Sequence, residues 1–165
     1  MNSSSPNPRG PEPAGVSAVL ALVLTTVGFF ALAVFGLGAL TVATDTDIIA
    51  VPGLGQLPGV IGMTVAVGAF ALGLGGALRR QHPTFLSVPV IALSVGLAHL
   101  VAVWIGVAAA SGDLIVATAV AGDLVRGGAS AVLLLAAAVA AWAGVALRRT
   151  RAERPRWPWE GGDEE

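Results

Sequence analysis

The sequence predicts an all-α membrane protein, a bundle of four transmembrane helices arranged as two antiparallel hairpins. Apolar residues make up 55% of the 165 residues and charged residues only 12%, whereas about 25% of a soluble domain is charged. The apolar residues lie in four charge-free runs of at least 20 residues, each long enough for a helix to cross ~30 Å of hydrocarbon. Strands of a membrane barrel would be ~10 residues long and would alternate in polarity, which these runs do not.

The first predicted span covers residues 16–42, after a stretch rich in Ser, Pro and Gly (1–15) that predicts a disordered cytoplasmic tail. A helix over 16–42 would be ~40 Å long, so it would cross with tilt or with its ends among the headgroups. The alternative is a signal peptide cleaved near Ala31-Leu32-Ala33. Its apolar region would be only ~7–15 residues long, and we favour a span because the apolar run continues past that site.

The second span is predicted over 59–78, because these 20 uncharged residues follow turn-forming residues and end at Arg79-Arg80. Residues 81–84, which include His82, are expected to form a short turn. The third span is predicted over 88–110, with Ser87 as its N-cap.

Residues 111–126 are ambiguous between a short helix at the membrane interface and a loop. Their apolar stretch, Leu114 to Ala121, is too short to cross a membrane, and Asp113 and Asp123 bracket it. We favour the interfacial helix, with Asp113 as its N-cap. The fourth span is predicted over 127–147, and residues 148–165 are predicted to form a polar cytoplasmic tail.

The arginines predict the orientation of the spans, because cytoplasmic segments carry an excess of basic residues. With four spans and a cytoplasmic N-terminus, only Arg126 of the nine arginines lies outside. The other eight lie inside: Arg9, Arg79, Arg80, Arg148, Arg149, Arg151, Arg154 and Arg156. We therefore expect a protein of the bacterial plasma membrane with both termini in the cytoplasm.

The composition also excludes several kinds of chemistry. The chain contains no cysteine, lysine or tyrosine and only two histidines, which excludes disulfides, Schiff-base catalysis and a Walker A motif. A net charge of −1 gives no indication of nucleic-acid binding. We expect no cofactor, no metal and no catalytic residue, so the sequence does not indicate an enzyme.

Small residues recur at every fourth position in two spans, as is typical of helices that pack closely in lipid. A shorter row of this kind is Gly62 and Ala66. The predicted helix-packing residues are Ala69, Gly73 and Ala77 of the second span and Ala136, Ala140 and Gly144 of the fourth. These rows would pack within one bundle, or would contact another membrane protein or a second copy of the chain.

His99 is the one ionisable residue well inside a predicted span, and its helical neighbours are mostly small. We therefore expect its side chain to face another helix, where an ionisable residue is a candidate functional site. A hydroxyl at similar depth would satisfy the hydrogen bonding of the imidazole. The candidate polar site consists of His99 and Thr64, and the other hydroxyls at similar depth are those of Thr25, Thr26 and Ser94. Three readings stay open: packing, proton or ion handling, and contact with a ligand or partner.

Two short motifs and one closing pair carry a resemblance to a known group of proteins. They are Asp45-Thr46-Asp47-Ile48-Ile49-Ala50 after the first span, Pro58-Gly59 at the start of the second, and Arg79-Arg80 at its end. With these motifs the chain resembles, over nearly its whole length, small four-helix membrane proteins of unknown function from GC-rich Gram-positive bacteria. The resemblance implies a bacterial plasma-membrane protein and implies no activity.

The function predicted from the sequence is that of a non-enzymatic scaffold or accessory subunit. Its partners would be the lipid bilayer and another membrane protein or a second copy of the chain. The alternative is a minor component of a transporter or channel that uses His99 at the bilayer midplane. A transporter should show a polar cavity that reaches His99, whereas an accessory subunit should show a dry bundle with an exposed groove of small residues.

Overall fold

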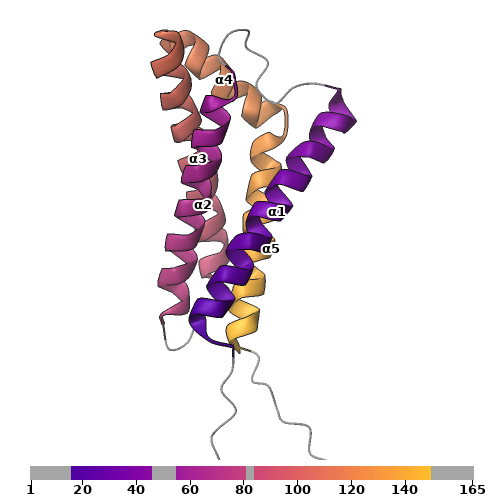
Figure 1. The fold of residues 1–165 in the computed structure, drawn as a ribbon, viewed down its shortest axis with the longest axis vertical. Coiled ribbons are helices and arrows are strands. Elements are labelled where there is room, and N and C mark those ends of the chain that lie inside the picture. Colours follow the sequence, from indigo (N-terminus) through magenta and orange to yellow (C-terminus); the bar gives the residue numbers. More distant parts are fainter. Residues whose placement is uncertain (1–15, 46–54, 81–83, 150–165) are drawn as a thin grey trace, which may run out of the picture.

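The computed structural model describes residues 16–45, 55–80 and 84–149. Within these ranges the chain forms five α-helices and no strand (Figure 1). They are α1 (Ala18–Thr44), α2 (Leu57–Leu78), α3 (Ser87–Ser111), α4 (Leu114–Arg126) and α5 (Ala129–Arg149). All except α4 are long and apolar enough to cross a membrane, as the all-α class and the four charge-free runs predicted. Of the predicted tails and the turn at His82, residues 1–15, 81–83 and 150–165 lie outside the described residues. Arg148 and Arg149, which were assigned to the second tail, belong to α5 instead.

The two predicted N-caps have opposite outcomes. The carboxylate of Asp113 accepts a hydrogen bond of 2.7 Å from the amide of Ile115 at the start of α4, so this prediction is confirmed. The prediction for Ser87 is wrong, because Leu86 is the N-cap residue of α3 and Ser87 already belongs to the helix. Its hydroxyl donates to the carbonyl oxygen of Thr84 at 2.7 Å instead.

The four long helices run along the bundle, so that one end of each lies at either end. The guanidinium of Arg148 donates to the carbonyl oxygen of Val16 at 3.1 Å, which holds the end of α5 beside the start of α1. We call this end, where α2 ends and α3 starts, the arginine end after Arg79, Arg80, Arg148 and Arg149. The opposite end is the aspartate end, after Asp45, Asp113 and Asp123 (Figure 1).

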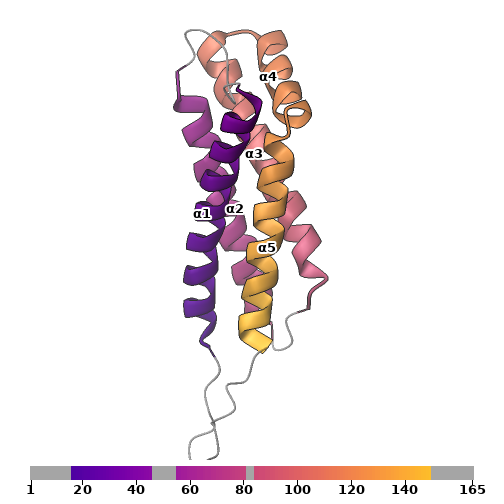
Figure 2. The ribbon, with the colours of Figure 1, turned by 90° about the vertical axis from the view of Figure 1, so that its right-hand side faces the viewer.

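The pairing of the helices does not reproduce two separate hairpins. The most extensive packing joins α2 to α3 and α1 to α5, while α1 and α2 share a smaller contact. Short α4 packs mainly on α3 at the aspartate end and leads into α5 (Figure 2). The helices therefore form one bundle in which α1 is attached chiefly through α5.

Two apolar cores lie one above the other along the bundle. The larger core fills the half near the arginine end, and in it the rings of Phe29 and Phe70 stack with centroids 4.6 Å apart. The smaller core lies at the aspartate end, where α4 covers Val103 and Val107 of α3. His99 lies between Val95 of the larger core and Val103 of the smaller one along α3.

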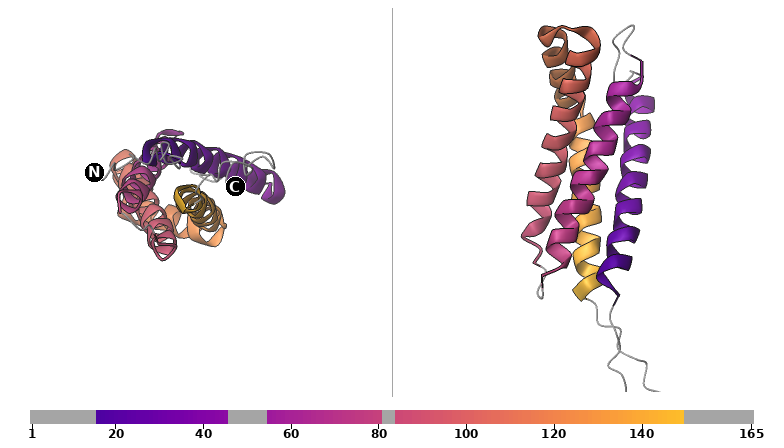
Figure 3. Two further views of the ribbon diagram at one scale, coloured as in Figure 1. Left: turned by 90° about the horizontal axis from the view of Figure 1, so that it is seen from below. Right: turned by 60° about the vertical axis from the view of Figure 1, so that its left-hand side comes forward.

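Helix α1 is packed along only the first part of its length. Its buried residues are Ala21, Thr25, Phe29 and Ala33, each four positions after the last, and none of its residues beyond Ala33 is buried. Towards the aspartate end α1 leans away from α2 and α3, as Figures 1 and 3 show. The lean separates α1 from α2 in that half of the bundle.

A candidate binding groove around His99

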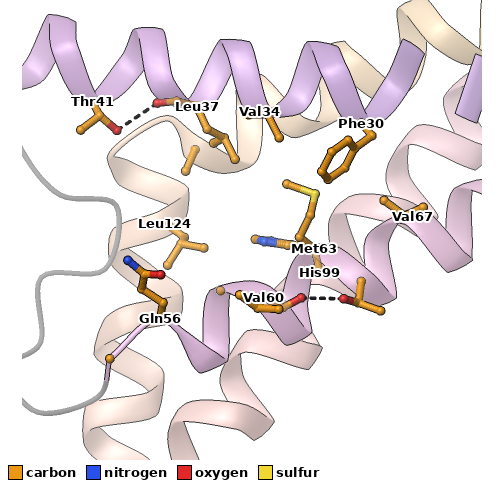
Figure 4. Close-up of a pocket in the computed structure, with 14 residues that line it drawn as sticks. Phe30, Val34, Leu37, Thr41, Gln56, Val60, Met63, Val67, His99 and Leu124 are labelled. Atoms are coloured by element: carbon orange, nitrogen blue, oxygen red, sulfur yellow. Dashed lines mark hydrogen bonds between the residues drawn. The ribbon is translucent and has the colours of Figure 1, made fainter. Parts of the chain in front are cut away.

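A groove of about 1010 Å³ lies between α1 and α2 in the half of the bundle near the aspartate end (Figure 4). We call it the lateral groove. Its apolar walls include Phe30, Val34 and Leu37 of α1 and Val60, Met63 and Val67 of α2. The volume lies at the upper end of the ~300–1,000 Å³ that is typical of small-molecule sites.

The lateral groove extends over about half of the membrane. Its lining on α1 runs from Phe30 to Thr41, and its lining on α2 runs from Gln56 to Val67. The twelve residues from Phe30 to Thr41 rise ~16 Å along a helix, against ~30 Å of hydrocarbon. The groove therefore runs from the aspartate end to about the middle of the bundle, and His99 lines it partway along, at the level of Gly62.

The imidazole of His99 lies against Gly62 of α2, and only 7% of the residue is exposed. A Cβ atom added at Gly62 would lie 3.1 Å from Cδ2 and 3.2 Å from Nε2 of His99. It would also lie 2.5 Å from Cγ2 of Val103, a distance that real Cβ contacts do not reach. The absence of a side chain at Gly62 therefore makes the space that the His99 ring occupies.

His99 has an unsatisfied polar atom. Its Nδ1 is buried and has no hydrogen-bond partner in the described structure, and Figure 4 shows the nitrogen-bearing end of the ring directed into the groove. The hydroxyl of Thr64 also lines the groove, but it donates to the carbonyl of Val60 at 2.8 Å. A hydrogen-bonding group in the groove would therefore meet the imidazole of His99 where the ring lines the groove, whereas Nδ1 itself is buried.

The other hydroxyls at similar depth do not serve His99 either. Thr25 is buried in the larger core and donates to the carbonyl of Ala21 at 2.6 Å. Ser94 is exposed and donates to the carbonyl of Val90 at 2.8 Å. Thr26 keeps a buried hydroxyl without a partner in the described structure. The hydroxyls that the sequence offered as partners therefore serve their own helices or remain unpaired.

The bundle is closed on the arginine-end side of His99. There Phe29 stacks on Phe70, and Ala66 and Leu74 are fully buried. The lateral groove stops on the aspartate-end side of this layer, and Val67 is the last residue of α2 that lines it. The described geometry therefore provides a site that is open to one side of the bundle and closed towards its arginine end.

The lining of the lateral groove allows one kind of polar chemistry. Its described residues include no Asp, Glu, Lys or Arg, and His99 is the one titratable side chain among them. In residues 16–45, 55–80 and 84–149 no group of three His, Asp or Glu side chains could hold a metal ion. The groove can therefore surround an apolar molecule and exchange a hydrogen bond with one neutral polar group.

The predicted packing rows lie in different environments. On α5, Ala136, Ala140 and Gly144 are buried, and a Cβ atom at Gly144 would lie 3.0 Å from Cδ2 of Leu74. This row therefore faces the interior, where the side chains of Leu74 and Thr25 lie against Gly144.

The row on α2 lies nearer the edge of its contact with α3. Ala77 is buried, Ala69 is partly buried and Gly73 is exposed. A Cβ atom at Gly73 would lie 3.4 Å from Cγ1 of Ile91, an ordinary contact. The closer approach of α2 to α3 is at Gly62, which belongs to the shorter row of Gly62 and Ala66. The contact of this row with His99 was not predicted.

The lateral groove itself has no signature in the sequence, because its walls are uncharged residues of the kind that also face lipid. Gln56 and Met63 line it and were not singled out. Gly62 lies one to two turns from the midplane, as do the hydroxyls considered for His99. A glycine at that depth could have indicated where α2 makes room for the His99 ring. Comparison of the chain with protein families, with characterised proteins and with solved structures gave no match.

Proposed function

We propose that the chain is a non-enzymatic, multi-pass accessory subunit of the bacterial plasma membrane that acts by binding in the lateral groove. The observation that carries the proposal is a groove of about 1010 Å³ that is lined by a buried histidine without a hydrogen-bond partner for its Nδ1 and that ends at Val67 on α2. An enzyme needs at least two convergent catalytic groups, and the described lining supplies one titratable side chain. Binding is the activity that this geometry supports best.

The test compares two neighbouring positions on α2. Val60 lines the groove and is 58% exposed, whereas Ile61 is 45% exposed and does not line it. Protein purified from native membranes should carry a stoichiometric component that the Val60→Trp variant loses and the Ile61→Trp variant keeps. The same composition in all three proteins, at equal thermal stability, would contradict the proposal.

The proposed orientation has the arginine end and both termini in the cytoplasm, in line with the excess of arginine there. It agrees with the resemblance to small four-helix proteins of Gram-positive bacteria, which we keep as part of the proposal. Reporter fusions at residues 50, 82 and 165 should read outside, inside and inside. A C-terminal reporter on the outer side would contradict this orientation.

The second candidate function is a minor component of a transporter or channel. It is favoured by the groove, which gives the titratable side chain of His99 access from one side. The stacked rings of Phe29 and Phe70 close the path beyond it and favour binding instead. The discriminating variant is His99→Gln, because an amide keeps a hydrogen bond but does not titrate near neutral pH.

The measurement is complementation of a deletion strain by a well-expressed His99→Gln protein. Full rescue removes proton handling and leaves the accessory role. The control on the same helix is Ser94→Ala, which should rescue. If Ser94→Ala rescues and His99→Gln does not, at unchanged stability, the result would favour transport and contradict the accessory role.

A further inference from the structure

We propose that the lateral groove binds a neutral lipid from the bilayer, one whose uncharged carbonyl or hydroxyl head exchanges a hydrogen bond with the imidazole of His99. The lipid would enter sideways between α1 and α2, and its apolar chain would lie along Val34 and Leu37 of α1. The inference rests on the proposed function, because it names the occupant of the same groove.

The chemistry of the walls selects a neutral head. The described lining contains no charged side chain that would pair with a phosphate, a carboxylate or an amine. An unpaired charge in an apolar site is far more costly than a neutral group that is hydrogen-bonded. The hydroxyls of Thr41 and Thr64 donate to carbonyls of their own helices. The other polar side chains of the lining are Gln56, at the start of α2, and His99, which lies deeper in the groove and would meet the head.

The length of the groove favours a lipid over a helix of another protein. The groove covers ~16 Å of helix, about half of the ~30 Å that a crossing helix would occupy. In the other half α1 is packed into the core at Ala21, Thr25 and Phe29, which leaves no continuous path for a second helix. A lipid chain, in contrast, fits a groove that begins at one end of the bundle and stops at mid-depth.

The packing around His99 prepares the site for the lipid head. Gly62 leaves room for the ring beside the groove, and Met63 next to it in the sequence has the unbranched, flexible side chain that adapts to irregular ligands. An oxygen at the imidazole would supply the missing hydrogen-bond partner. Binding would then give the groove-lining imidazole of His99 a hydrogen-bond partner that the apolar walls do not supply, which is the energetic reason for the specificity.

The experiment measures equilibrium binding to the whole protein in phosphatidylcholine nanodiscs. The probes are decyl-benzoquinone, which presents carbonyl oxygens, and dioleoylglycerol, which presents a hydroxyl. Dioleoyl phosphatidic acid is the charged comparison. We expect one neutral probe to bind with at least tenfold higher affinity than the phosphatidic acid. Which probe binds shows whether the head of the lipid is a carbonyl or a hydroxyl. Absence of binding by both neutral probes overturns the inference.

The role of His99 is tested with variants on α3. His99→Leu should lower the affinity about tenfold, the value of one hydrogen bond, whereas His99→Gln should keep it within about threefold because the amide still hydrogen-bonds. Ser94→Ala is the matched control, since Ser94 is exposed and serves its own backbone. Equal affinity of His99→Leu and Ser94→Ala, at equal thermal stability, overturns the role of His99.

Cysteine labelling tests whether the lipid lies in the groove, because the chain contains no cysteine of its own. Val34 lines the groove, and its neighbour Phe35 is 77% exposed and does not. The bound probe should slow labelling of Val34→Cys by a membrane-permeant maleimide and leave Phe35→Cys unchanged. Equal protection at both positions overturns the inference, as does efficient disulfide formation between copies at Val34→Cys, which would make a second copy the occupant.

The two proposals fail in different ways. If neither neutral probe binds but Val60→Trp still removes a co-purifying membrane protein, the lipid is refuted and the accessory role stands. If the probe binds and His99→Gln abolishes complementation, the accessory role is contradicted while the site remains.

Discussion

The two halves of α1 differ in packing, although one stripe of residues at every fourth position, on a face that winds slowly around the helix, runs through both. Near the arginine end, Thr25, Phe29 and Ala33 of this face are buried in the larger core. Four and eight positions after Ala33, Leu37 and Thr41 line the lateral groove. One stripe of side chains therefore packs in one half of the bundle and faces an open groove in the other.

The difference shows how helices associate in lipid. Apolar side chains gain little from leaving lipid for a protein interior, so helices stay together where their surfaces fit closely. In the closed half the stacked rings of Phe29 and Phe70 supply that fit. In the open half α1 keeps its fit to α5, where a Cβ atom at Gly36 would lie 2.6 Å from Cγ1 of Val132, and loses its fit to α2.

The largest expected effect contrasts two phenylalanines, one in each half. Phe70 is fully buried, whereas Phe30 lines the groove and is 49% exposed. Phe70→Ala should lower the free energy of unfolding by ~3–5 kcal/mol, as for a large side chain removed from a core. Phe30→Ala should cost less than ~1 kcal/mol because little packing is lost. Unfolding in detergent measures both, and equal losses would mean that the two halves are packed alike.

An intermediate effect is expected at the glycines of α2. Gly62→Ala should destabilise the protein by ~1–3 kcal/mol, because the new Cβ atom meets Val103 and His99 and overpacks the contact. Gly73→Ala should be neutral or stabilising by up to ~1 kcal/mol, since Gly73 is exposed and alanine is the better helix former. Thermal unfolding of the two variants tests this, and a larger loss at Gly73 would assign the principal packing row to Ala69, Gly73 and Ala77.

The smallest effect is expected in the helix that covers the aspartate end. Asp113→Ala should cost ~1 kcal/mol through loss of the N-cap of α4. Asp123→Ala should cost less than ~0.5 kcal/mol, because its ion pair with Arg126 is 3.7 Å long and lies between exposed side chains. Hydrogen exchange of the α4 amides should report faster opening for Asp113→Ala only. Faster opening for both variants would indicate that the ion pair also holds α4 in place.

Much of the fold followed from the sequence, and part of the site did too. The charge-free runs predicted the four long helices, since only a helix satisfies its own backbone over such a length in lipid. The small neighbours of His99 predicted a side chain turned towards another helix, and its ring lies against Gly62. The hydrogen bond considered between His99 and Thr64 was not predictable in this way, because the hydroxyl of Thr64 donates within its own helix.

By itself the sequence determined how many helices are long and apolar enough to cross the membrane and which of their ends carry arginine, because both depend on the local run of residues. The tertiary structure alone decided that α1 packs on α5 and leans away from α2. The spans are apolar on every side, so no polar face indicates which neighbour a helix selects. The lateral groove depends on this choice, since it lies where α1 has separated from α2.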